Sequence, residues 1–143
     1  IASSYYSNNY PKYIVDFDDN FTNFQSSNKA NSWICYDFKE SKVRPSCYSI
    51  RSNSLGDKCW FHPQSWCIEG SNDYQNWKIL DDRKNETSLN SKSATDTFKI
   101  QNILNKNEFY RFLRIRQTDV NTKNNHCLIL SSLEFFGSIN VPI

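Results

Sequence analysis

Short apolar stretches alternate with longer polar ones along this chain, and several of the apolar stretches repeat every second residue. Within residues 65–69, the apolar Trp66 and Ile68 are two positions apart, and the charged Glu69 falls at an alternate position. A period of two is typical of a half-buried strand, because successive side chains point to opposite faces. No segment of useful length shows the 3.6-residue period of an amphipathic helix. The pattern predicts an all-β protein.

Seven segments have the composition of short strands, separated by connections rich in the turn-forming residues Asn, Ser and Asp. The predicted strands are residues 33–38, 46–53, 65–69, 77–80, 95–100, 109–117 and 127–137. Residues 13–17 form an eighth short apolar segment, either a strand or one helical turn. This number of short strands favours an antiparallel β-sandwich.

Several apolar strand positions are expected to fill the space between two sheets, because large aromatic side chains on alternating strands usually face inward. They are Trp33, Tyr36, Trp66, Ile68, Trp77, Phe112, Ile115, Leu133 and Phe135.

Composition sets bounds on the function. The 143 residues suit one domain, placed at residues 1–143 with its core at about 10–137. The net charge is only +2 and the basic residues are scattered, so nothing points to nucleic-acid binding. No apolar run approaches the length of a membrane span. Because the chain lacks an initiator Met, we expect it to be part of a larger polypeptide or assembly.

The five cysteines cannot all pair with one another. None lies before Cys35 or after Cys127, so no disulfide can join the two ends, as it does in many small secreted domains. Cys59 and His62 form a lone C-x-x-H, and a zinc site needs about four ligands. We therefore expect reduced thiols and an intracellular, cytoplasmic location.

Four ordered blocks resemble one known family: WICYDF at 33–38, SWCIEGSNDYQNW at 65–77, FYRFLRI at 109–115 and LEFFG at 133–137. They are similar to the motifs of the discoidin, or coagulation factor type C, domain. Among discoidin domains, the chain most resembles those found in intracellular proteins that also contain BTB domains. The resemblance implies a galactose-binding-like jelly-roll sandwich that binds its ligand without transforming it.

The resemblance also implies that the ligand binds at one end of the sandwich, through loops near residues 20–31, 53–64 and 119–126. Aromatic rings in these loops could stack on a sugar, and amide or basic groups could meet its hydroxyls. The candidate residues are Asn53, Lys58, Trp60, Phe61, His62, Asn121, Lys123, Asn125 and His126. In the alternative interpretation, the aromatic pair packs under its own loop and the Asn residues only form turns.

A calcium site is a further implication of the resemblance, because residues 15–22 are similar to a segment that holds structural calcium in lectin-like members. The matching positions are Asp16, Asp18, Thr22 and Glu134. Calcium prefers such oxygen ligands. However, Phe17 replaces a glycine of the family pattern, and one extra residue separates the acids from Thr22. Alternatively, the acids cap a turn and Glu134 pairs with an arginine. No other cofactor is expected.

Catalysis is not expected. The two histidines, His62 and His126, have cysteines close in sequence, but neighbours along the chain rarely reach nucleophile–base geometry. We expect a non-catalytic module that binds a protein partner through the loops. The alternative is a carbohydrate-binding module for galactose or fucose, with residues 60–62 as its platform. A structural component docked in a larger assembly is a third hypothesis, and membrane binding ranks last.

Overall fold

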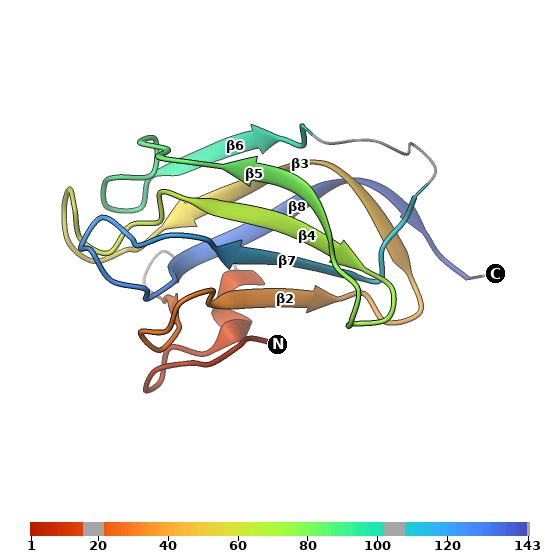
Figure 1. Cartoon of the computed structure of the whole chain (residues 1–143), viewed down its shortest axis with the longest axis horizontal. Helices are drawn as coiled ribbons and strands as arrows, with labels where there is room; N and C mark the ends of the chain where they lie inside the picture. The colour runs from red at the N-terminus through yellow and green to blue at the C-terminus, as the bar shows by residue number, and fades with distance from the viewer. Residues whose placement is uncertain (16–21, 102–107, 143) are drawn as a thin grey trace.

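Two four-stranded antiparallel sheets face each other in the computed structural model, which describes residues 1–15, 22–101 and 108–142 (Figure 1). One sheet has the strand order β1-β8-β3-β6 and the other β2-β7-β4-β5. The strands are β1 (Phe24–Gln25), β2 (Trp33–Asp37), β3 (Lys42–Ser52), β4 (Trp66–Ser71), β5 (Lys78–Arg83), β6 (Thr95–Lys99), β7 (Phe112–Gln117) and β8 (Ile129–Asn140). The predicted all-β sandwich is confirmed.

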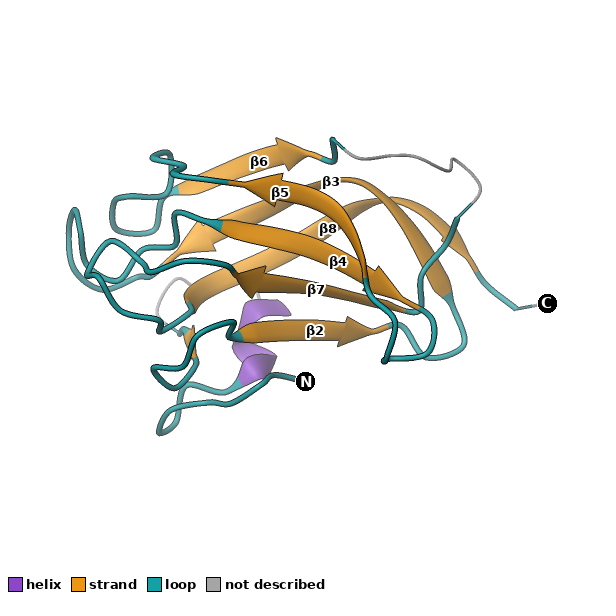
Figure 2. Cartoon of the chain, viewed as in Figure 1, coloured by secondary structure: helices purple, strands orange, loops and turns teal. Residues whose placement is uncertain are grey.

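Helix is nearly absent from the described residues, as Figure 2 shows. The 3-10 turn η1 (Pro11–Val15) covers the first part of the apolar segment predicted at 13–17, and residues 16 and 17 lie outside the described residues. Within the described ranges, no helix is long and apolar enough to cross a membrane.

β3 and β8 are longer than the sequence pattern indicates and pair along most of their length. β3 begins at Lys42 rather than at Ser46, and the register shifts between Pro45 and Cys47. Proline has no backbone N–H to donate to the ladder, so a bulge beside it is the expected accommodation. β8 likewise extends three residues beyond Gly137.

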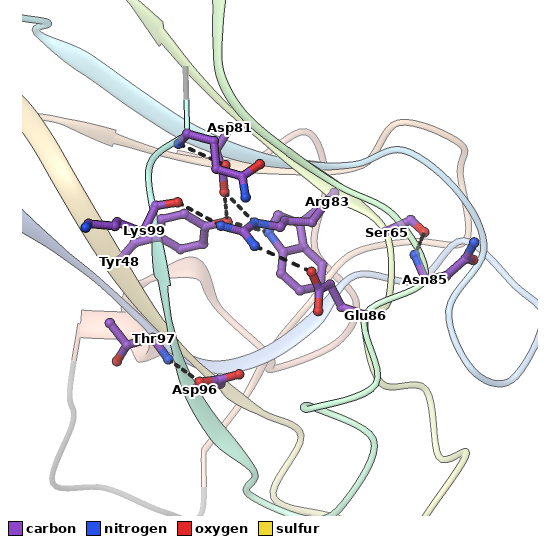
Figure 3. Close-up of polar contacts among 11 residues, drawn as sticks. Tyr48, Ser65, Asp81, Arg83, Asn85, Glu86, Asp96, Thr97 and Lys99 are labelled. Atoms are coloured by element: carbon purple, nitrogen blue, oxygen red, sulfur yellow. Dashed lines mark hydrogen bonds and ion pairs between the residues drawn. The ribbon is translucent and has the colours of Figure 1, made fainter. Parts of the chain in front are cut away.

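A buried polar chain crosses the core between the sheets (Figure 3). Trp66 is fully buried, and its Nε1 donates to the Tyr48 hydroxyl at 2.9 Å. Tyr48 in turn donates to Asp81 Oδ2, which also accepts from Arg83 Nε. The Arg83 guanidinium then donates to the carbonyl of Lys99 at 2.7 Å. These contacts join β5, at one edge of its sheet, to β6, at one edge of the other sheet.

Two tryptophans expected in the core lie on the outer face of the β2-β7-β4-β5 sheet instead. Trp33 and Trp77 are both half-buried, and the Arg114 guanidinium lies between them, 5.3 Å and 3.8 Å from their ring centroids. In β2, Ile34 faces the core, so the preceding residue must face outward. Phe112 also lies outside the core cluster, although it is buried.

Candidate functional site

Three loops meet at one end of the sandwich, at the left in Figure 1, and comprise residues 26–32, 53–65 and 118–128. His62 N donates to Thr122 Oγ1 at 2.9 Å, and Thr122 N donates to the His62 carbonyl at 3.0 Å. His126 N donates to Asn28 Oδ1 at 2.8 Å. The loops implicated by the sequence therefore form one connected surface.

The 53–65 loop presents an aromatic pair on this surface. Trp60 keeps 42% of its surface exposed, and its ring meets that of half-buried Phe61 edge to face at 5.3 Å. Lys123 Nζ approaches from the 118–128 loop, 5.2 Å from the Trp60 ring centroid. The pair does not simply pack under its own loop, because Trp60 remains available for a ligand. Exposed aromatic surface of this kind is typical of binding sites.

The backbone that carries this pair is strained. Cys59 and Phe61 have positive φ, at 61° and 58°, whereas the φ of 73° at Gly56 is one that glycine adopts without strain. The left-handed region costs an L-residue about 1–2 kcal/mol, and it is rare for a bulky side chain such as Phe. Strained backbone persists only where the surrounding structure enforces it, so the contacts of this loop must hold the two residues in place.

His62 fixes this loop from inside and does not face solvent. Its side chain is fully buried, and Nε2 lies 2.8 Å from the carbonyl oxygen of Asp57. A carbonyl can only accept, so Nε2 donates its proton to Asp57 in this hydrogen bond. Among the described residues, Nδ1 has no hydrogen-bond partner. His62 therefore acts as a positioning residue for the segment that leads to Trp60.

Asn53 and Asn121 are also buried, at 3% and 1% exposure. Asn53 Oδ1 accepts from Leu55 N at 2.9 Å, which turns the chain into the loop. Asn121 Oδ1 accepts from Lys123 N at 2.9 Å, and its Nδ2 donates to the Cys127 carbonyl at 2.9 Å. The turn-forming alternative thus describes Asn121, whereas Asn53 also borders the pocket described next.

A pocket of about 200 Å³ opens beside the aromatic pair. Apolar surface and side-chain amides line it together, from Asn9, Asn23, Gln25, Asn53, Leu55, Trp60, Phe61 and Ile129. Among the described residues that line it, none carries a charge. Asn23 is held firmly, because its Oδ1 accepts from Ser54 N and its Nδ2 donates to Ser54 Oγ, both at 3.0 Å.

The structure therefore divides the nine predicted ligand residues into groups. Asn53, Trp60 and Phe61 line the pocket, and Lys123 lies beside it. The remaining five do not line it; they are His62 and Asn121, which are buried, the exposed Lys58, and the half-buried Asn125 and His126. Five lining residues were missed, because a single amide or aliphatic side chain in a polar segment carries no distinguishing signal; they are Asn9, Asn23, Gln25, Leu55 and Ile129.

The predicted calcium ligands can be placed only in part. Asp16 and Asp18 lie outside the described residues. Thr22 is half-buried, and Glu134 is exposed on β8, opposite Ser49 of β3. In the described ranges, no group of three or more His, Cys, Asp or Glu side chains is arranged to hold a metal ion. Calcium binding through Asp16 and Asp18 stays a prediction.

The structure pairs none of the five cysteines in a disulfide. Burial raises the pKa of both Cys35 and Cys67 to about 12, and it also raises the pKa of Cys127. A thiol is a nucleophile only as its thiolate, so these three buried cysteines are unreactive near neutral pH. Cys59 differs because it is exposed, directly before Trp60. The cytoplasmic location inferred from the thiols remains a prediction.

No protein-family profile matches this sequence. Solved structures with the same fold include the family 32 carbohydrate-binding module of Clostridium perfringens NanJ in complex with galactose (TM-score 0.70, 10% identity, 98% of this chain and 91% of the other). Another is a C. perfringens module, CpGH89CBM32-5, in complex with GalNAc-β-1,3-galactose (TM-score 0.72, 11% identity, 96% and 93%). A third is the lectin domain of lectinolysin with Lewis B antigen (TM-score 0.69, 14% identity, 96% and 91%). The fold is the galactose-binding-like, discoidin-type sandwich.

These neighbours correct the leading functional prediction. The sequence favoured a module that binds a protein partner, but the structures of this fold are carbohydrate-binding modules and a lectin domain, three of them with sugars bound. The protein-partner interpretation is therefore wrong on this comparison, and these neighbours favour the carbohydrate-binding alternative. The proposed similarity to BTB-protein domains stays a prediction.

Proposed function

We propose that this domain is a non-catalytic carbohydrate-binding module that holds one neutral sugar ring in the pocket beside Trp60. The exposed Trp60 ring, fixed by a strained loop at the mouth of an amide-lined pocket, carries this proposal. The sugar complexes of the structural neighbours support it.

The pocket combines the two surfaces that a sugar requires. A pyranose has an apolar face of C–H groups, which an aromatic ring can cover, and a rim of hydroxyls, which both donate and accept hydrogen bonds. Trp60 and Phe61 supply rings, while Asn9, Gln25 and Asn53 supply amides. Each amide has two N–H donors and a carbonyl with two lone pairs, so Asn53 retains capacity for a ligand beyond its bond to Leu55.

Size and charge narrow the ligand class. The pocket volume of about 200 Å³ is below the roughly 300–1,000 Å³ of pockets for drug-sized ligands, so it suits a single ring. No charged residue lines the described part of the pocket, so a neutral hexose or N-acetylhexosamine is the first ligand class to test, and Lys123 beside Trp60 is the one neighbouring charge that the ligand would meet among the pocket contacts described above. Galactose and N-acetylgalactosamine are the first candidates, because neighbours of this fold bind them or glycans that contain them.

Two tryptophan variants on a glycan array test this function. Trp60→Ala removes the exposed ring at the pocket, and Trp77→Ala removes a half-buried ring on the outer sheet face as a matched control. We expect the wild type and Trp77→Ala to retain galactose- or GalNAc-terminated glycans, and Trp60→Ala to lose them. An array on which the folded wild-type protein retains no glycan would overturn the proposal.

A further inference from the structure

The N-terminal segment is fastened along the edge of β1, next to the pocket. Tyr6 N donates to the Gln25 carbonyl at 2.8 Å, and Gln25 N donates to the Asn9 carbonyl at 3.3 Å. Ser27 N donates to Ser4 Oγ at 3.0 Å. Three hydrogen bonds therefore hold residues 4–9 against β1 and the residues that follow it. Gln25 of β1 lines the pocket.

A tight turn within this segment brings Tyr6 close to the pocket wall. Asn9 N and Asn9 Nδ2 each donate to the Tyr6 carbonyl at 3.2 Å, and Ser7 at the turn has a φ of 53°. The first and fourth residues of such a turn have Cα atoms within about 7 Å of each other. Since Asn9 lines the pocket, the backbone of Tyr6 lies within one turn of a pocket-lining residue.

The Tyr6 ring is exposed and uncommitted, in contrast to its neighbour. Tyr6 and Tyr5 keep 59% and 55% of their surface exposed. The Tyr5 ring packs 5.4 Å from that of Tyr10, which also lies 5.6 Å below Lys12 Nζ. Within the described part of the chain, the Tyr6 ring contacts no other ring or cation. Tyr6 therefore presents an open aromatic ring on a backbone that the hydrogen bonds to Gln25 and Asn9 already hold in place.

We infer that Tyr6 forms a second stacking subsite, which receives the sugar next to the one held in the pocket. This inference rests on the proposed function and narrows its ligand class to oligosaccharides of at least two residues. The first sugar ring binds between Trp60 and the amide side chains. The second sugar ring lies outside the pocket, passes above Asn9 and stacks on the ring of Tyr6. Because the backbone of Tyr6 is already fixed, stacking requires little further ordering of the chain.

Calorimetric titration with a matched pair of sugars tests this subsite. N-acetylgalactosamine and GalNAc-β-1,3-galactose differ only by the second ring. We expect the wild type to bind the disaccharide roughly three- to tenfold more tightly than the monosaccharide, as the gain from one added stacked ring. In Tyr6→Ala that difference disappears, while monosaccharide affinity is unchanged.

Two further variants serve as controls. Tyr6→Phe keeps the ring and therefore keeps the preference for the disaccharide, and Tyr5→Ala removes an equally exposed ring that packs on Tyr10 and also keeps it. The inference is overturned if the wild type binds both sugars equally, or if Tyr6→Ala retains the difference. If the wild type binds neither sugar, the galactose-type specificity proposed for the pocket fails instead.

Discussion

A β-carbon on Gly56 would lie 2.1 Å from Cγ of Trp60. The Trp60 side chain thus lies directly against the backbone of the residue four positions earlier, in space that only glycine leaves open. Gly56 also has a φ of 73°, which other residues rarely adopt. The orientation of Trp60 therefore depends on its own loop, through the space that Gly56 leaves open.

Gly56→Ala should consequently weaken sugar binding although Gly56 does not line the pocket. The new methyl group displaces the Trp60 side chain, so we expect affinity to fall at least about fivefold, because the ring must be repositioned on binding. The positive φ should lower the free energy of unfolding by about 1 kcal/mol. Calorimetric titration with galactose and thermal unfolding measure the two effects.

Gly70→Ala provides the control for Gly56→Ala. Its β-carbon would meet the Tyr110 ring at 2.7 Å, in the core and away from the pocket-lining residues. We expect lower stability but unchanged affinity of the folded protein. Equal affinities for Gly56→Ala and the wild type would show that the position of Trp60 does not matter for binding.

His62→Ala should both destabilise the protein and weaken binding. The substitution removes a fully buried side chain and leaves the Asp57 carbonyl without its donor. We expect the free energy of unfolding to fall by about 2–3 kcal/mol. His62→Gln, which can still donate to that carbonyl, should recover part of both losses. A His62→Ala protein with wild-type affinity for galactose would contradict the positioning role.

Thiol labelling should separate the cysteines by burial. At pH 7.5, we expect maleimide to modify exposed Cys59 first in the folded protein, and to leave Cys35, Cys67 and Cys127 protected. After denaturation without reductant, all five should react. Mass spectrometry gives the number of labelled cysteines in the folded and in the denatured protein. Rapid labelling of Cys35 or Cys67 in the folded protein would be incompatible with their buried positions.

Acid should weaken the outer face of the β2-β7-β4-β5 sheet. Burial opposes ionisation of Glu69, but hydrogen bonds from Arg116 at 2.8 Å and Arg114 at 3.0 Å hold the pKa of Glu69 below its ordinary value. The stabilisation is complete above the unfolded-state pKa, near 4.3, and is lost as the pH falls through the lower folded-state pKa.

We therefore expect the free energy of unfolding to decrease below about pH 4.3, and Glu69→Gln to reduce that slope. Chemical denaturation between pH 3 and pH 7 provides the measurement. An identical pH dependence in the wild type and Glu69→Gln would show that Glu69 is not the responsible carboxylate.

The sequence predicted the strands well because in most of them every second residue is apolar. The prediction of which side chains face the core failed where consecutive residues are all apolar. In β2, Trp33 and Cys35 alternate with Ile34 and Tyr36, so periodicity cannot say which set faces the core. Trp77 precedes β5 and packs on Arg114 through a cation–π contact, which depends on the neighbouring strands β4 and β7 and leaves no local signal.

Of the pocket proposed as the site, the sequence drew attention mainly to the aromatic residues. Trp60 and Phe61 stood out because large rings in a polar loop are unusual. Asn9 and Gln25 could not be assigned, since the N-terminal segment joins the pocket through backbone hydrogen bonds that carry no side-chain pattern. His62 was predicted as a contact, but burial makes it a support for the loop.

The indole N–H signals of the four tryptophans test the central claim most directly. Each indole gives one peak in a ¹H–¹⁵N correlation spectrum, and a Trp60→Phe variant assigns the peak of interest. On titration with GalNAc-β-1,3-galactose, we predict that the Trp60 peak moves progressively while those of Trp33, Trp66 and Trp77 stay in place. A titration in which the Trp60 peak does not move would contradict sugar binding at this pocket.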